Sequence, residues 1–171
     1  MKFVFADLYS KAMFCSKLIT PIGLLLIKSD AEVLSFIGFD DEAEENPGEI
    51  TEHVKLQLQE YFNGKRSSFH FPVDQAGTAF QKKVWTELKN IEAGKPISYA
   101  ALSKRMDNPL AIRAIAAANG KNKLMIVVPC HRVIGSSGEL VGYAGGLWRK
   151  KWLLEHEARM TNIGQASLQF I

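Results

Sequence analysis

The chain has 171 residues, of which 47% are hydrophobic, and this is enough for two small domains or for one domain with an extension. Its two cysteines, Cys15 and Cys130, lie in unlike settings, which argues against a disulfide framework and for a reduced, cytoplasmic protein. Charged residues interrupt residues 1–19, so we expect no secretory signal and no membrane-spanning segment.

The net charge of +3 is unevenly distributed along the chain. Residues 1–75 contain 7 Lys and Arg against 12 Asp and Glu, whereas residues 76–171 contain 14 against 6. We predict an N-terminal domain over residues 1–75 and a C-terminal domain over residues 76–171 that meets a polyanion, with phosphate backbones the obvious candidate. On charge alone, a merely solvated basic face is an equally good explanation.

The first half carries the pattern of a small sheet with one helix. Three stretches read as strand material: residues 3–20, 24–28 and 33–39. The polar residues between the second and third stretches are typical of a hairpin. From Glu49 the apolar residues recur at helical spacing, and Gly64 stops this helix. Residues 67–71 are expected to return to the sheet.

The second half carries start and stop signals for four helices. Thr78 begins a capping-box pattern, and Ser98 can cap a second helix that runs to about Met106. A third helix follows after a tight turn, and two short helices so joined predict a helix-turn-helix. Residues 147–160 are expected to form the last helix.

The third of these helices has Asn108 as its predicted cap and Pro109 at its first position, and it ends at Gly120. Arg113 is its only charged residue, and five of its other positions are alanine. Small side chains permit tight helix–helix packing, and they equally permit the helix to press on a nucleic-acid groove with Arg113 leading. The basic balance of this half favours the second explanation. The residues assigned to DNA binding are Asn108, Ala111, Arg113, Ala114 and Ala116.

A reactive turn is predicted after Ile126, where a short β-branched run is halted by Pro129. Near neutral pH a free thiol is mostly protonated, so a nucleophilic Cys130 needs a base. Glu157 lies on a leucine face of the last helix, where a carboxylate requires a cation or a donor, and His131 is the natural partner. Oriented by Glu157, His131 could take the thiol proton directly or through a water.

Plainer explanations exist for these motifs. Without further context, a buried structural thiol beside a surface imidazole explains the Cys-His pair better. No second Cys or His lies at ligand spacing around Cys130, so a metal site is not expected. Residues 142–146, Gly-Tyr-Ala-Gly-Gly, either offer bare backbone donors to a planar or anionic ligand or form a plain connector.

Read as a block, Pro-Cys-His-Arg-Val-Ile at residues 129–134 resembles the active-site signature of the O6-alkylguanine-DNA alkyltransferases. These methylated-DNA–protein-cysteine methyltransferases repair alkylated guanine by moving the alkyl group to their own cysteine. The resemblance covers about residues 78–160. Its further motifs are Ile97-Ser98-Tyr99, Arg113 in the alanine-rich helix, and residues 119–122, 142–146 and 152–157.

The resemblance implies a role for each matching residue. Cys130 would be the alkyl acceptor, with His131 and Glu157 as the relay that ionises it. Asn122 would brace the active-site turn, and Tyr99 would protonate or hydrogen-bond the leaving guanine.

For DNA handling, the resemblance implies that Arg113 fills the gap left by a flipped nucleotide from the minor-groove side. The substrate pocket is assigned to Met125, Val133, Tyr143, Ala144 and Gly145. Met125 stands where some members have a proline, which bears on the width of the alkyl pocket.

We therefore expect an α/β plus α protein with a small, mixed α/β, ribonuclease-H-like N-terminal domain and a C-terminal winged helix-turn-helix-like alkyltransferase domain. It would act as a monomer, without cofactor or metal, on double-stranded DNA containing O6-alkylguanine, with O4-alkylthymine as a second candidate substrate. Three alternatives remain: a non-catalytic lesion-binding relative, against which Cys130 argues, a DNA-binding regulator, and a Cys-His-Glu hydrolase.

Overall fold

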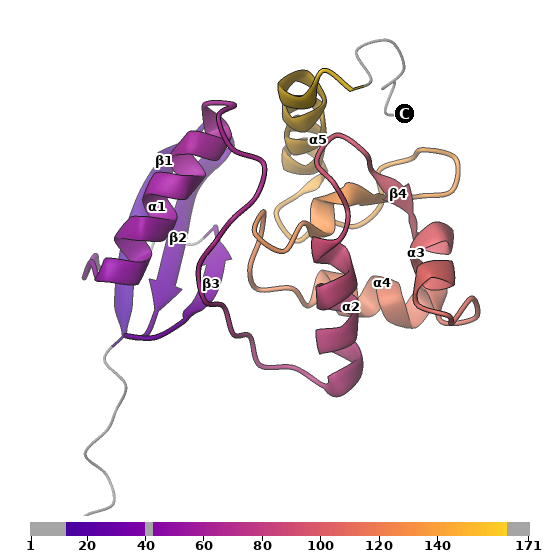
Figure 1. Ribbon diagram of the computed structural model, residues 1–171, viewed down its shortest axis with the longest axis horizontal. Helices are drawn as coiled ribbons and strands as arrows, with labels where there is room; N and C mark the ends of the chain where they lie inside the picture. The colour runs from indigo at the N-terminus through magenta and orange to yellow at the C-terminus, as the bar shows by residue number, and fades with distance from the viewer. Residues whose placement is uncertain (1–12, 40–42, 164–171) are drawn as a thin grey trace, which may run out of the picture.

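The N-terminal half is a three-stranded sheet covered by one helix (Figure 1). The computed structural model describes residues 13–39 and 43–163, and the strand prediction for residues 3–12 lies outside them. The strands are antiparallel in the order β1-β2-β3, and α1 packs on β1 and β2. The elements are β1 (Phe14–Thr20), β2 (Gly23–Ser29), β3 (Leu34–Gly38) and α1 (Glu49–Phe62).

Local signals explain this half well. The predicted hairpin is confirmed, because β2 pairs with β3, and Asp30 closes their turn by accepting hydrogen bonds from the amides of Glu32 and Val33. The predicted helix is also confirmed, and it buries Val54, Leu58 and Tyr61 on one face.

The prediction of a strand over residues 67–71 is wrong. The outer edge of β3 is taken instead by the next segment, where the Leu34 amide donates to the Pro72 carbonyl and the Asp74 amide donates to the Leu34 carbonyl. Further along the same edge, Ile37 exchanges backbone hydrogen bonds with Lys123 and Met125 of the C-terminal half. With its edge groups paired in this way, β3 has no place for residues 67–71.

The C-terminal half is mainly helical and places a short parallel strand pair between its helices (Figure 1). Thr78 and Ser98 accept the expected capping hydrogen bonds from Gln81 and Ala101, which confirms both predicted helix starts. The strand pair, which was not predicted, joins two two-residue strands. The elements are α2 (Ala79–Lys89), β4 (Ile97–Ser98), α3 (Tyr99–Arg105), α4 (Ile112–Gly120), the 3-10 helix η1 (Cys130–Arg132), β5 (Val133–Ile134) and α5 (Leu147–Thr161).

One prediction of local structure in this half is wrong. Helix α4 begins at Ile112 rather than at Pro109, because Asn108 does not cap it but closes a turn in which its carbonyl accepts from the Ala111 amide. The predicted turn before the reactive cysteine is present, and within it Ile126 has a φ of 72°.

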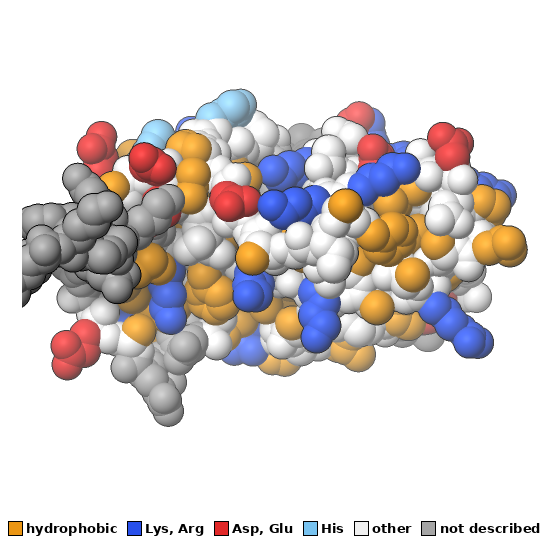
Figure 2. All heavy atoms as spheres, turned by 90° about the horizontal axis from the view of Figure 1, so that it is seen from below, with side chains coloured by type: hydrophobic (Ala, Val, Ile, Leu, Met, Phe, Trp, Pro, Cys, Tyr) orange, Lys and Arg blue, Asp and Glu red, His pale blue; other side chains and the backbone are white. Residues whose placement is uncertain are grey.

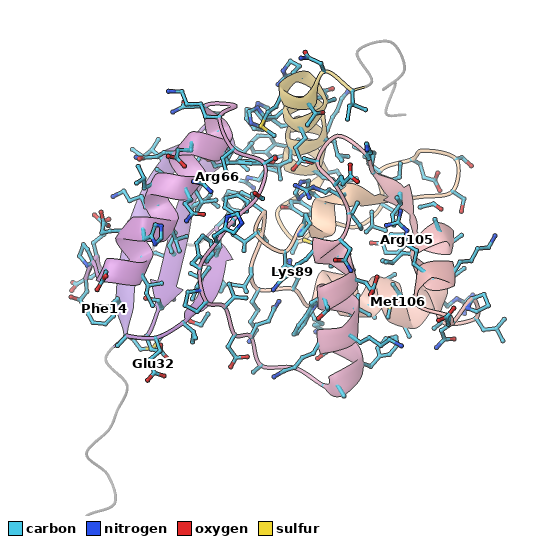
Figure 3. All side chains as sticks on the ribbon, viewed as in Figure 1. Phe14, Glu32, Arg66, Lys89, Arg105 and Met106 are labelled. Atoms are coloured by element: carbon cyan, nitrogen blue, oxygen red, sulfur yellow. The ribbon has the colours of Figure 1, made fainter. Side chains whose placement is uncertain are left out.

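The two halves share one hydrophobic core that runs from the sheet to α2, α4 and α5. A cleft of about 170 Å³ lies between them on one side, and Lys89 near the end of α2 points into this region (Figure 3). Lys and Arg side chains cover much of the middle and right of the face shown in Figure 2. Within the described residues, every helix is too short or too polar to cross a bilayer.

Candidate active site

The turn that carries Cys130 is held by the side chain of Asn122. Its Nδ2 donates to the carbonyl of Val128 at 2.8 Å, and its Oδ1 accepts from the amide of Leu124 at 3.0 Å. Gln75, from the segment between the two halves, donates to the same Oδ1 at 3.2 Å. Ile126 has an unfavourable positive φ, and these hydrogen bonds hold the backbone before and after it in place.

Cys130 lies at the start of η1 and is 5% exposed. Burial raises the pKa of its thiol, while a hydrogen bond from Asn122 and the positive charge of Lys150 act in the opposite direction. The net shift is upward, so the resting site holds a thiol. Ionisation must then accompany the reaction, which requires an acceptor for the proton.

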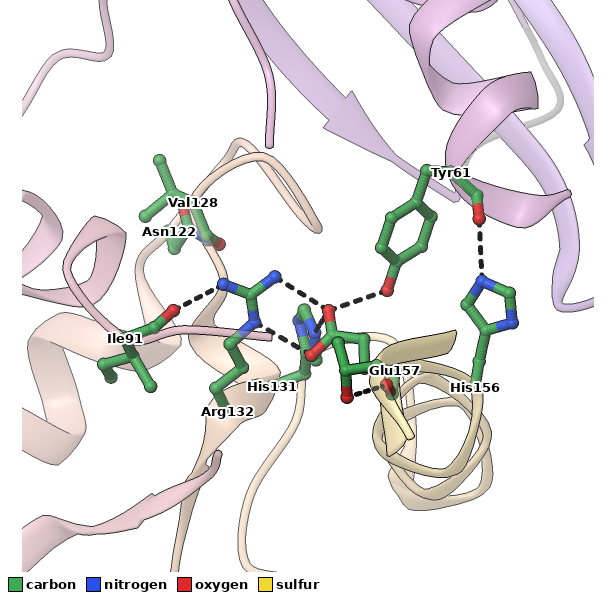
Figure 4. Close-up of polar contacts among 9 residues, drawn as sticks. Tyr61, Ile91, Asn122, Val128, His131, Arg132, His156 and Glu157 are labelled. Carbon is green, nitrogen blue, oxygen red and sulfur yellow. Dashed lines mark hydrogen bonds and ion pairs between the residues drawn. The ribbon is translucent and has the colours of Figure 1, made fainter. Parts of the chain in front are cut away.

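Beside the thiol, a buried charge cluster centres on the Glu157 carboxylate (Figure 4). His131 Nε2 lies 2.9 Å from Oε1, as the sequence predicted. Arg132 donates from Nε to Oε2 and from Nη2 to Oε1, each at 2.9 Å. The hydroxyl of Tyr61 also donates to Oε1, at 2.9 Å. Each carboxylate oxygen is thus hydrogen-bonded, which allows a charge to be fully buried.

The directions of the pKa shifts in this cluster indicate which of its side chains are charged. Burial opposes ionisation of Glu157, but the attraction and hydrogen bonds of His131 and Arg132 lower the pKa of its carboxyl well below its usual range. Burial also lowers the pKa of His131, and Glu157 opposes this without reversing it. At neutral pH the imidazole is therefore neutral. Within the described residues its Nδ1 has no hydrogen-bond partner, so one ring nitrogen is free to receive a proton.

Sequence reasoning did not assign roles to Arg132, Tyr61 or Lys150. Arg132 stood within the quoted cysteine block, and a buried carboxylate called for a cation, so a signal for it existed. Tyr61 was indistinguishable from a core aromatic on a helical face. Lys150 lies in a run of three basic residues that reads as a solvated surface, yet it is buried and donates to the carbonyls of Val133 and Val141 at 2.7 Å. Burial lowers its pKa to about 8.

Tyr99 stands at the first position of α3, where its hydroxyl accepts a hydrogen bond from Nδ2 of Asn119 at 2.8 Å. The same amide group lies 3.3 Å from the carbonyl of Cys130, so Asn119 links the tyrosine to the cysteine turn. Burial raises the pKa of Tyr99. Its hydroxyl consequently keeps its proton at neutral pH and can donate it.

A cavity of about 260 Å³ opens beside Tyr99. The predicted pocket residues Tyr143 and Ala144 line it, whereas Gly145, Val133 and Met125 are absent from the lining, which consists of Tyr99, Ala116, Gly120, Val141, Gly142, Tyr143 and Ala144. Val133 and Met125 are buried in the core. A β-carbon at Gly145 would lie 2.8 Å from the Tyr143 ring, so glycine permits the close approach of this loop to the ring.

The α4 helix has two different faces. Ile115 and Ala118 are buried and face the packed side, where α4 contacts α2 and α3. Arg113 and Ala114 are exposed on the other side, together with Asn108 in the preceding turn. Ala111 is half-buried, and Ala116 lines the cavity. The tight-packing explanation of the alanine-rich sequence therefore applies to the buried face. Contact of the exposed face with a nucleic-acid groove stays a prediction.

Within residues 13–39 and 43–163, no group of three or more His, Cys, Asp and Glu side chains is arranged to hold a metal ion.

The fold and the site define a class of protein in which a thiol, an imidazole and a carboxylate lie beside a helix-turn-helix. Comparison with known families agrees. Residues 13–75 match the family model for the ribonuclease-like domain of 6-O-methylguanine DNA methyltransferase, and residues 79–159 match that for its DNA binding domain. The chain belongs to this family.

Individual relatives support the assignment. The chain is 41% identical over 147 residues to the methylated-DNA–protein-cysteine methyltransferase of Methanosarcina acetivorans, covering 81% of this chain and 94% of that protein. The corresponding protein of Mycobacterium leprae is 40% identical over 151 residues, covering 84% and 91%. The crystal structure of the Mycobacterium tuberculosis O6-methylguanine methyltransferase is 36% identical, with a TM-score of 0.79 over 87% of this chain and 94% of that chain.

A further structural neighbour carries nucleic acid. The Mycobacterium tuberculosis OGT in complex with DNA is 37% identical, with a TM-score of 0.77 over 84% of this chain and 92% of that chain. The predicted fold class, an α/β domain of ribonuclease-like fold followed by a DNA-binding domain, is thereby confirmed. The predicted boundary between residues 75 and 76 stays a prediction.

Proposed function

We propose that this chain reverses alkylation of guanine O6 in double-stranded DNA by transferring the alkyl group to Cys130, once per molecule. The observation that carries the proposal is the position of Cys130, held in a braced turn beside the buried pair of His131 and Glu157. The family in which this arrangement occurs includes curated relatives named as methylated-DNA–protein-cysteine methyltransferases.

The proposed step is a displacement at the alkyl carbon. The sulfur of Cys130 forms the new S–C bond, and the bond from that carbon to guanine O6 breaks. The thiol proton passes to the free Nδ1 of His131, and Glu157 stabilises the imidazolium that forms. Tyr99 hydrogen-bonds the leaving guanine or gives it a proton. The proton on His131 is later released to solvent, and a Tyr99 that has given up its proton takes one back from solvent.

The geometry also supports a location for the substrate. Tyr99 and Tyr143 face the same cavity, and its volume of about 260 Å³ suits a single planar base rather than a duplex. The target nucleotide must therefore leave the stack. We assign the surrounding duplex to the exposed face of α4, with Arg113 filling the space that the flipped nucleotide vacates.

The product explains the limit of one turnover. A thioether at Cys130 is chemically stable, and the proposed site contains no second nucleophile to remove the alkyl group. The reaction needs neither a cofactor nor a metal, and we expect the protein to act as a monomer in the cytoplasm. The proposal extends to O4-alkylthymine as a second substrate, which presents an alkylated oxygen in a similar position.

Mass spectrometry tests the assignment of the nucleophile. After incubation with an O6-methylguanine duplex, we expect one added methyl group on the peptide that contains Cys130. Cys130→Ser should show none while still binding the lesion duplex, because groove contacts do not need the thiol. The matched control is Cys15→Ser, which removes the other cysteine and should leave transfer intact.

Each alternative predicts a different result. Methyl removal by Cys130→Ser would contradict the acceptor role. Release of more than one equivalent of product per protein would favour a hydrolase, and a sequence-specific footprint that is indifferent to Cys130 would favour a regulator.

A further inference from the structure

The N-terminal half contributes a side chain to the charge cluster of the C-terminal half. Tyr61, near the end of α1, donates its hydroxyl to Oε1 of Glu157 at 2.9 Å, across 96 positions of sequence. Both side chains are fully buried. A hydrogen bond between two halves of a chain at such a site calls for a role beyond packing, because a phenylalanine would fill the same volume without a polar atom to satisfy.

We propose that Tyr61 is a positioning residue for the alkyl transfer, whose hydroxyl holds the Glu157 carboxylate in place against His131. This inference rests on the proposed function, since it assumes that His131 accepts the thiol proton. Tyr61 touches neither the substrate nor the sulfur in this account and acts through Glu157.

The Glu157 carboxylate has donors on two sides. Arg132 pulls on both carboxylate oxygens from one side through two hydrogen bonds of 2.9 Å. In Figure 4 Tyr61 lies on the opposite side of the carboxylate from Arg132. A cation attracts a carboxylate more strongly than a neutral imidazole does. Without a donor opposite Arg132, the carboxylate would therefore move toward Arg132 and away from His131.

Tyr61 is itself held firmly enough to serve this purpose. Its backbone carbonyl accepts a hydrogen bond from Nε2 of His156 at 2.7 Å, and its ring packs edge-on against the His156 ring at 5.2 Å between centroids. His156 in turn stacks on Trp152. His156 thus holds both the backbone and the ring of Tyr61, independently of Glu157, so the Tyr61 hydroxyl has little freedom to follow a moving carboxylate.

The protonation states agree with a permanent donor. Burial, and next the negative charge of Glu157, raise the pKa of Tyr61 well above its usual value, so the hydroxyl keeps its proton throughout the working pH range.

The titratable and charged groups around the relay are Tyr61 from α1, Cys130 and Arg132 from η1, Tyr143 from the glycine-rich loop and Lys150 from α5. Among those whose charge acts on His131, Arg132 and Lys150 lower its pKa and Glu157 raises it. A displaced Glu157 would therefore leave His131 a weaker base.

The test compares Tyr61→Phe with the unaltered full-length chain. Transfer should slow by about threefold to tenfold, which is the range of one net hydrogen bond. The acid-side midpoint of the pH–rate profile, which reports deprotonation of His131, should fall. The loss of rate should be equal on an O6-methylguanine duplex and on free O6-benzylguanine, because DNA handling is untouched. By NMR, the titration midpoint of the His131 ring should fall.

The matched control is Val54→Ala, which removes buried volume two turns earlier on the same face of α1. It should lower the melting temperature without moving either midpoint. Unchanged midpoints in Tyr61→Phe, or an equal shift in Val54→Ala, would overturn the positioning role. If the unaltered protein transferred no methyl group to Cys130, the proposed function would fail, and this inference with it.

Discussion

The buried charge cluster and the exposed face of α4 differ in whether their charged side chains have partners within the protein. Around Glu157 every strong donor has an acceptor, and the side chains come from three elements that are distant in sequence. On α4, Arg113 is exposed and forms no ion pair with the rest of the described chain. The charges that we propose take part in alkyl transfer are compensated within the fold, whereas the charge that we propose contacts DNA has no internal partner within the described residues.

This difference implies that the two regions fail differently. A change in the cluster should reduce folding stability and also slow transfer to any substrate, because both depend on the same hydrogen bonds. A change on the exposed face should leave stability and free-base transfer intact and reduce only the reaction on duplex DNA. The following variants test that separation.

The largest effect is expected for Glu157→Ala. It leaves the buried Arg132 without its carboxylate, and breaking a buried ion pair costs about 3–5 kcal/mol of unfolding free energy. Urea unfolding measures this loss. The control is Glu155→Ala on the same helix, which removes a carboxylate that lies 3.9 Å from Lys151 in a largely solvated pair and should cost less than about 1 kcal/mol. Similar losses of unfolding free energy in both variants would contradict the conclusion that Glu157 is the central partner of the buried charge cluster.

A smaller and more selective effect is expected for Arg113→Ala. Flipping a nucleotide costs a few kcal/mol, and a side chain that holds the vacated space supplies part of it, so transfer on an O6-methylguanine duplex should slow by about tenfold to a hundredfold. Transfer from free O6-benzylguanine should stay nearly normal. Arg105→Ala removes an exposed charge from the neighbouring helix and should weaken binding only slightly. Equal losses on both substrates would mean that Arg113 supports the fold or the pocket.

The smallest effect concerns pH and the stability of the cluster. Burial lowers the pKa of His131 below 6.5. As the pH falls through about 6.5, His131 is therefore protonated in the unfolded chain before it is protonated in the folded chain. The unfolding free energy should therefore fall as the pH drops below about 6.5, by at most about 1.4 kcal/mol per pH unit. The lowered pKa of Glu157 adds a loss only below about pH 4.5. Urea unfolding between pH 7.5 and 5.5 measures the slope.

The control for this slope is the exposed His53. His53→Gln should keep the pH dependence, whereas His131→Asn should flatten it. A slope that survived in His131→Asn would place the responsible proton elsewhere.

Sequence reasoning succeeded where the cause of a structure is local. Thr78 and Ser98 begin their helices because each side chain caps an amide three positions later, and that spacing is legible in the chain. It failed at residues 67–71 for the opposite reason, because segments distant in sequence already take the edge of β3. It failed at Asn108 because an asparagine suits either a helix cap or a turn, and here it closes a turn with Ala111.

The residues of the site also divide into those whose contacts the sequence indicated and those whose contacts it did not. The pairing of His131 with Glu157 was predictable, because a carboxylate on a leucine face demands a partner and few were available. The contribution of Tyr61 was not, because nothing in α1 distinguishes a tyrosine that packs from one that also donates across the domain border. Nothing in the sequence indicated that Lys150 is buried. The two groups that accept its hydrogen bonds are backbone carbonyls, which every residue possesses.

The backbone pairing of Ile37 with Lys123 and Met125 has a consequence for aggregation. An uncovered strand edge presents unpaired amides and carbonyls to other molecules and promotes sheet growth between chains. In this protein the edge of β3 is covered by the same turn that carries the reactive cysteine. Any event that pulls the two halves apart would therefore both displace the turn before Cys130 and uncover an edge at which chains can pair.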